Sequence, residues 1–168
     1  MKEQQQTEKP GPSGTSGVGF SKPRIFPPIW LAIAFIAMAA LDRWLPLAHV
    51  FTGGASLPAW LVMAAGLAVV LIAANGFRRA RTGIVPFSES TSLVTSGIYR
   101  YTRNPMYLGM VLILAGLAIK LGSLSAWIPI PVFVIVIQRQ FIRNEELFLS
   151  GIYGDEFLEY KRRVRRWI

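Results

Sequence analysis

The chain of 168 residues has no cysteine and only one histidine, His49. Without cysteine it forms no disulfide, has no thiol nucleophile and offers no thiolate ligand to a metal. His49 stands beside Val50 and Phe51 in an expected interhelix loop, where a solvated residue is favoured over a catalytic one. A histidine-based metal site or a Ser-His triad therefore has no basis in this sequence, and no metal is expected.

Charge is also scarce. Charged residues make up 16% of the chain and hydrophobic residues 52%, with a mean hydropathy of +0.42, whereas an ordinary soluble domain is about one quarter charged. The 18 Lys and Arg residues against 9 Asp and Glu give a net charge of +9. Because the basic residues cluster between and after apolar runs, membrane topology explains them better than nucleic-acid binding, and no nucleic-acid partner is expected.

What the sequence does have is long apolar runs. Four are long enough, or nearly long enough, to cross a bilayer, at about residues 29–48, 57–77, 106–121 and 124–142. Only "KLGSL" separates the last two, so these should form a tight antiparallel helical hairpin. The chain is therefore predicted to be an all-α, polytopic membrane protein with about four transmembrane helices.

The basic residues predict the orientation of these helices. They gather before the first run, between the second and third, and after the fourth, whereas the other two connections hold only Arg43 and Lys120. Positively charged loops stay in the cytoplasm, so both termini and the long central loop are expected there. The protein is therefore expected to be integral to a bacterial inner membrane.

The two ends of the chain differ in character. Residues 1–24 are rich in Gln, Gly, Ser and Pro and are expected to form a disordered cytoplasmic tail, which leaves 25–168 as the membrane domain. At the other end, "YGDEFLEYKRRVRRWI" spaces apolar residues helically among basic ones. An interfacial helix at about 153–166, lying against anionic lipid, is favoured over a solvated basic tail.

The stretch "SGIYRYTRNPMYLGM" opens the third run with polar and aromatic residues. Asn104 is a preferred helix N-cap, and Pro105 is favoured at the first helical position. The start of a helix also has free N–H groups that suit a carboxylate or a phosphate. On these residues alone, a capped helix with interfacial aromatic residues is favoured over a binding site.

Glu145 and Glu146 follow the fourth run. Carboxylates this close to hydrocarbon are costly unless they are paired, and Arg139 and Arg143 are the expected partners. A juxtamembrane salt bridge would by itself explain two adjacent glutamates. The hairpin, however, should bring these glutamates beside the start of the third helix. This convergence favours a cytoplasmic pocket for a polar, partly cationic ligand, since aromatic faces can hold a cation.

Four features follow one another along the chain: "LVTSGIYRYTRNPMYLG", the apolar hairpin, "EE" and "YGDEFLEYKRRV". In this order they resemble the isoprenylcysteine carboxyl methyltransferase family and the related phospholipid N-methyltransferases. The resemblance covers Thr91 to Val164. It implies that S-adenosyl-L-methionine is the cofactor, held in a cytoplasm-facing pocket. It also implies that a lipidic or small hydrophobic methyl acceptor enters from the membrane lipid.

The resemblance carries residue roles with it. Cofactor contacts would fall on Thr91, Ser92, Leu93, Val94, Tyr99, Asn104, Pro105, Met106, Tyr107 and Glu145. Glu146 and Arg143 would be the catalytic residues. Two departures are present, because the carboxyl methyltransferases usually have His at the position of Asn104 and a substrate-binding arginine at the position of Phe141. Arg143 or Arg139 would then have to replace that arginine.

Three functions remain open on the sequence. An isoprenylcysteine carboxyl O-methyltransferase-like enzyme is the leading one, and a phospholipid or other lipid amine N-methyltransferase is favoured by "NPMY". A non-catalytic membrane protein is the alternative of another class. A related membrane reductase would need a nicotinamide-binding signature, which the sequence lacks.

Overall fold

The computed structural model of the protein describes residues 26–50, 56–80 and 93–168. The elements named within these ranges are all helices. The α-helices are α1 (Pro27–Trp44), α2 (Ser56–Arg79), α3 (Pro105–Leu121), α4 (Pro129–Ile137), α5 (Arg143–Tyr153) and α6 (Asp155–Arg163). Short 3-10 helices at Gly97–Arg100 and Leu124–Trp127 precede α3 and α4, and a π-helical turn at Gln138–Ile142 joins α4 to α5. The all-α prediction is confirmed.

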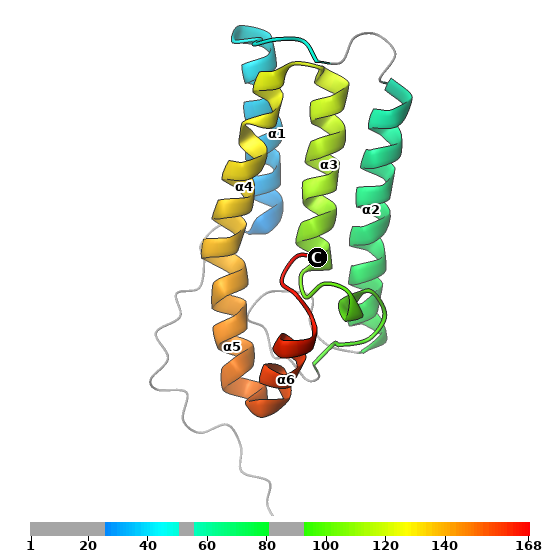
Figure 1. Ribbon diagram of the computed structural model, residues 1–168, viewed down its shortest axis with the longest axis vertical. Helices are drawn as coiled ribbons and strands as arrows, with labels where there is room; N and C mark the ends of the chain where they lie inside the picture. Colours follow the sequence, from blue (N-terminus) through cyan, green and yellow to red (C-terminus); the bar gives the residue numbers. More distant parts are fainter. Residues whose placement is uncertain (1–25, 51–55, 81–92) are drawn as a thin grey trace, which may run out of the picture.

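Helices α1 to α4 stand side by side, and α5 continues the line of α4 beyond the bundle (Figure 1). Three helical stretches of the described chain are long and apolar enough to cross a membrane, namely Pro27–Trp44, Ser56–Arg79 and Leu124–Tyr153. Helix α3 is a shorter apolar helix. Helix α1 ends at Trp44, earlier than its apolar run, because Pro46 disfavours a helical conformation at the preceding Leu45.

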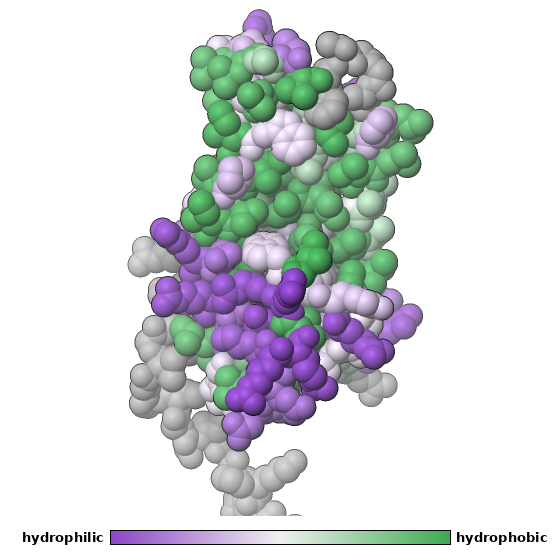
Figure 2. All heavy atoms as spheres, in the orientation of Figure 1, coloured by the Kyte–Doolittle hydropathy of each residue, from purple (hydrophilic) through white to green (hydrophobic). Residues whose placement is uncertain are grey.

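The surface of the bundle divides into an apolar belt and a polar end. Large apolar side chains are exposed along the bundle, among them Ile33, Ile36, Leu61, Leu71 and Ile135. Figure 2 shows this belt in green, with the hydrophilic residues gathered at the end that contains α5 and α6. Exposed apolar surface on this scale is expected of side chains that face lipid.

Helices α1, α3 and α4 enclose the main apolar core. Met38, Leu114 and Ile137 are fully buried there, and Phe133 is 3% exposed. The hairpin between α3 and α4 turns at Gly122, whose φ of 87° is easy only for glycine. The segment after α1 fixes this turn, because Leu124 donates to the carbonyl of Ala48 at 2.8 Å and Val50 donates to that of Gly122 at 2.8 Å.

Helices α2 and α3 pack by close backbone approach rather than by large side chains. A Cβ added at Gly109 would lie 2.6 Å from the carbonyl oxygen of Gly66 and 3.0 Å from the backbone nitrogen of Val70. At Gly116 it would collide with the Cγ of Met63 and lie 2.8 Å from the carbonyl oxygen of Ala59. Small residues stabilise helix pairs in lipid in this way, since apolar burial between helices gives no net gain there.

Gly109→Ala should therefore destabilise the bundle. The new methyl group meets backbone on α2 that cannot move independently, so we expect a loss of about 1–3 kcal/mol. Thermal unfolding in detergent measures it. Gly151→Ala is the control, because a Cβ at that exposed position of α5 meets nothing within 4 Å. If both variants melted at the wild-type temperature, the conclusion that α2 and α3 pack by close backbone approach would be wrong.

Candidate functional site

The site is built around the start of α3. Pro105 occupies the first helical position, as predicted, and Asn104 stands at the N-cap. The predicted capping bond is wrong, because the Asn104 side chain makes no hydrogen bond to the helix. Its Nδ2 instead donates to the carbonyl oxygen of Arg166 at 2.9 Å. A carboxamide has donors as well as an acceptor, so the returning C-terminal segment competes successfully for it.

The C-terminal segment after α6 is tied to the loop that precedes α3. Thr102 Oγ1 donates to the same Arg166 carbonyl at 3.2 Å, and the backbone nitrogen of Arg103 donates to that of Arg165 at 3.0 Å. In Figure 1 the chain therefore ends beside the lower end of α3. These bonds fix the position of Arg103 and Asn104 at the mouth of the site.

Helix α6 also packs against protein. Phe157 and Tyr160 are buried, with Leu93, Leu149 and Tyr153 against them. The Tyr160 hydroxyl donates to the carbonyl oxygen of Tyr99 at 2.7 Å. Burial raises the pKa of Tyr160 to about 12, so the hydroxyl remains a donor at neutral pH. The helix lies within the expected range of 153–166, and its contact with anionic lipid stays a prediction.

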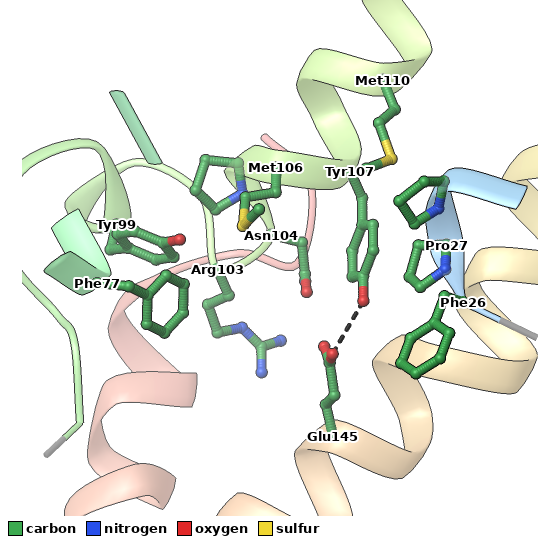
Figure 3. A pocket seen from close by; sticks show the side chains of 12 residues that line it. Phe26, Pro27, Phe77, Tyr99, Arg103, Asn104, Met106, Tyr107, Met110 and Glu145 are labelled. Carbon is green, nitrogen blue, oxygen red and sulfur yellow. Dashed lines mark hydrogen bonds between the residues drawn. The ribbon is translucent and has the colours of Figure 1, made fainter. Parts of the chain in front are cut away.

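A cavity of about 320 Å³ opens at this end of the bundle (Figure 3). It is lined by Phe26, Pro27, Pro28, Phe77, Tyr99, Arg103, Asn104, Pro105, Met106, Tyr107, Met110 and Glu145. The start of α1 and the end of α2 supply aromatic and proline walls, while the start of α3 supplies most polar groups. The cavity is thus apolar for most of its lining, with a few polar groups among the apolar ones.

A hydrogen bond between two lining residues joins α3 to α5. The Tyr107 hydroxyl donates to Glu145 Oε1 at 2.9 Å, drawn as the dashed line in Figure 3. The Tyr107 ring is 7% exposed and packs at a tilt on Phe141, with centroids 6.4 Å apart. Phe141 is itself buried. Phe141, where the resemblance implied a substrate-binding arginine, is therefore part of the core beneath Tyr107.

Six of the ten predicted cofactor residues line this cavity: Tyr99, Asn104, Pro105, Met106, Tyr107 and Glu145. Leu93 does not line it but packs against the α6 cluster, and Val94 lies near Gly76 on α2. Thr91 and Ser92 lie outside the described residues. The roles of all ten in cofactor binding stay predictions.

Glu146 does not have the partners that the sequence suggested. Its carboxylate, 9% exposed as a residue, accepts from Arg166 Nε at 2.9 Å and Nη2 at 2.7 Å. It also pairs with Arg103 at 3.1 Å and with Lys161 at 3.5 Å. No ion pair joins either glutamate to Arg139 or Arg143 within the part of the chain that the structure describes. The expected pairing is wrong because the chain folds back and brings nearer cations.

The two predicted catalytic residues, Glu146 and Arg143, line a different cavity, of about 440 Å³. Consecutive helical residues point about 100° apart, so Glu145 and Glu146 face different sides of α5. The π-helical turn before α5 rotates both glutamates together relative to α4, since a wider turn changes the register of everything after it. Catalytic roles for Glu146 and Arg143 stay predictions, and neither residue lines the cavity of Tyr107 and Glu145.

Sequence reasoning missed Arg103 as a site residue and counted it only for membrane orientation. Its guanidinium lies in the first cavity (Figure 3). It also pairs with Glu146, which lines the second cavity. Its Nε is buried and has no hydrogen-bond partner among the described residues. An arginine directly before an Asn-Pro helix start was the available signal, because a helix N-terminus favours anionic ligands and a neighbouring cation strengthens that preference.

Fold and site together define an integral membrane protein of all-α class with a cavity at the polar end of its helical bundle. The family described as "Phospholipid methyltransferase" matches residues 56–156, more than half of the chain. The chain belongs to this family.

Curated relatives agree with the family. A protein of Haemophilus influenzae described as uncharacterized is 41% identical over 63 residues, which is 38% of this chain and all of that protein. Human protein-S-isoprenylcysteine O-methyltransferase is 34% identical over 77 residues, 46% of this chain and 27% of the enzyme. Protein-S-isoprenylcysteine O-methyltransferase A of Arabidopsis thaliana is 32% identical over 80 residues, which is 48% of this chain and 41% of that enzyme. The chain thus spans less than half of these named enzymes, and no solved structure matches it.

The Arg166–Glu146 pair should hold the site together. Arg166→Gln removes a bidentate partner from a buried carboxylate, so we expect a loss of about 1–3 kcal/mol, less than for a fully buried pair because Arg166 is 33% exposed as a side chain. Thermal unfolding measures it, with the exposed neighbour Arg165→Gln as control. Combining Arg166→Gln with Glu146→Gln should recover part of the loss. Additive losses in the double variant would contradict the pairing.

Proposed function

We propose that this protein is an S-adenosyl-L-methionine-dependent methyltransferase of the membrane, of the isoprenylcysteine carboxyl O-methyltransferase type. The observation that carries the proposal is the first cavity, where the Tyr107–Glu145 pair and the start of α3 meet an apolar wall from α1. A cavity of this kind suits ligands that have both charged and hydrophobic parts. On the distribution of basic residues, this end of the bundle and both termini belong in the cytoplasm, in a bacterial inner membrane.

The residues of the cavity fit the cofactor chemically. A sulfonium cation suits the carboxylate of Glu145 and the faces of Tyr99 and Phe77. A carboxylate suits Arg103, whose buried Nε needs an acceptor that no described residue supplies. The volume of about 320 Å³ lies at the lower end of the range for small-molecule sites.

The task of these residues would be positioning and exclusion of water. S-adenosyl-L-methionine supplies an activated methyl group, and its transfer to an acceptor needs no covalent bond to the protein. The rigid frame of α3 and α5, joined by the Tyr107–Glu145 bond, orients both reactants. The apolar wall of Phe26 and Pro27 keeps water away, so a bare nucleophile stays reactive.

The nature of the acceptor decides whether a base is needed. A carboxylate acceptor is already ionised at neutral pH and needs no base. An amine must first lose a proton, and Glu145 is the carboxylate within the cavity lining that could accept it. The second candidate function, methylation of a phospholipid amine, is favoured by Glu145 and by the match to the phospholipid methyltransferase family.

Cofactor binding tests the proposal directly. Titration calorimetry of the detergent-purified protein with S-adenosyl-L-methionine should give saturable binding. Glu145→Gln should weaken it about tenfold or more, because a charge-assisted contact is lost, and Tyr107→Phe about two- to tenfold.

Glu156→Gln is the matched control for that titration, since Glu156 is exposed on α6 and lines neither cavity. Its affinity should equal that of the wild type. A folded wild-type protein that does not bind the cofactor would contradict the proposal and favour a non-catalytic membrane protein.

The acceptor class is distinguished by the stability of the product. With a labelled methyl donor, a prenylated cysteine should yield a methyl ester that releases methanol in alkali, whereas phosphatidylethanolamine vesicles would yield an alkali-stable N-methyl product. We expect the alkali-labile product and its loss in Arg103→Gln. Labelling of the phospholipid alone would establish the second candidate function.

A further inference from the structure

A second cavity lies on the other side of α5 from the Tyr107–Glu145 pair. The resemblance implies catalytic roles for two of its lining residues, Glu146 and Arg143, but it assigns no ligand to the cavity. Its volume is about 440 Å³. It is lined by Gln138, Arg139, Arg143, Glu146, Leu147, Ser150, Lys161 and Arg166. These residues come from the π-helical turn, α5, α6 and the C-terminal segment, so only the folded chain brings them together.

The lining carries four cations, Arg139, Arg143, Lys161 and Arg166, against one carboxylate. Glu146 is already shared by Arg166, Lys161 and Arg103. Arg139 and Arg143 form no ion pair with any residue that the structure describes. Like charges four residues apart on a helix repel each other, so these two arginines are unfavourable neighbours until an anion joins them.

The cavity lies at the depth where the bundle leaves the apolar belt. The apolar helix α4 ends at Ile137, and Gln138 and Arg139 open the polar part of the chain. The Trp167 indole donates to Gln138 Oε1 at 3.2 Å, and tryptophan is enriched at the membrane interface. Figure 2 shows hydrophilic residues bordering the green belt directly. Polar residues that border an apolar belt are expected at the level of the lipid phosphates.

We propose that this basic cavity, formed by Arg139, Arg143, Lys161 and Arg166, binds the phosphate group of an anionic phospholipid from the adjacent leaflet. Guanidinium groups match the geometry of phosphate oxygens and bind them in pairs. Leu147, 41% exposed beside them, offers an apolar contact to the glycerol or acyl part of a lipid. A free phosphate would use the same arginines but would gain nothing from Leu147 or from the membrane depth.

This inference goes beyond the proposed function and does not depend on it. Lipid occupancy of this cavity requires neither cofactor nor methyl transfer. The two can therefore fail separately, since calorimetry with S-adenosyl-L-methionine reports on the first cavity and lipid binding reports on the second.

The test uses the full chain in neutral detergent and two short-chain lipids below their micellar concentrations. Dihexanoyl phosphatidylglycerol is anionic, and dihexanoyl phosphatidylcholine carries a choline cation that the basic lining disfavours. Thermophoresis gives both affinities. We expect the anionic lipid to bind at least about tenfold more tightly, because each basic residue near an anionic lipid is worth about a fivefold change.

The decisive variant is Arg139→Gln/Arg143→Gln, which should weaken phosphatidylglycerol binding by about 25-fold. The matched control is Arg162→Gln/Arg163→Gln, which removes the same charge from exposed positions of α6 that do not line the cavity. It should bind within about twofold of the wild type. The melting temperature checks that each variant is folded, and the single Arg143→Gln variant, with an expected loss of about fivefold, replaces the double variant if that does not fold.

Two results would overturn the proposal. Equal losses in the two double variants would mean that only the overall charge attracts the lipid. Inorganic phosphate that binds as tightly as phosphatidylglycerol, with the same loss in Arg139→Gln/Arg143→Gln, would assign the cavity to a soluble phosphate instead of a lipid.

Discussion

The buried carboxylate of Glu146 is the constraint on which the polar end of the molecule depends. A charge removed from water costs several kcal/mol unless it is compensated, and here the compensation comes from Arg166, Lys161 and Arg103. These cations lie before α3, on α6 and after α6, so satisfying one carboxylate requires the C-terminal segment to return to the bundle. That return supplies the carbonyl of Arg166 to Asn104 and fixes the mouth of the first cavity.

The apolar part of the bundle obeys different physics. In lipid there is no hydrophobic gain from burying one apolar helix on another, so packing geometry decides which helices associate. Helices α2 and α3 meet through Gly66, Gly109 and Gly116, whereas α1, α3 and α4 interlock through large side chains such as Met38 and Leu114. Both interfaces share α3. The helix that opens the first cavity is consequently held on two sides, which gives its polar start a fixed position.

Helix α5 separates two chemically different environments. Among the described residues, Glu145 faces a mostly apolar cavity and has one donor, Tyr107, whereas Glu146 faces a basic cavity and has three cationic partners. Arg103 links the two, since it lines the first cavity and pairs with the residue that lines the second.

The sequence by itself determined the helical class, the apolar segments and the helix start at Pro105, because hydropathy and local helix rules depend on neighbours along the chain. Six of the residues that line the first cavity were named through the family resemblance. Only the tertiary structure decided which charges meet. Arg139 and Arg143, close to the glutamates in sequence, line a cavity without pairing with them, while Arg166, twenty residues away, makes the bidentate contact. The Asn104 side chain likewise bonds across 62 residues instead of capping its own helix. Pairing of buried charge is set by where the chain returns in space, and sequence proximity does not contain that information.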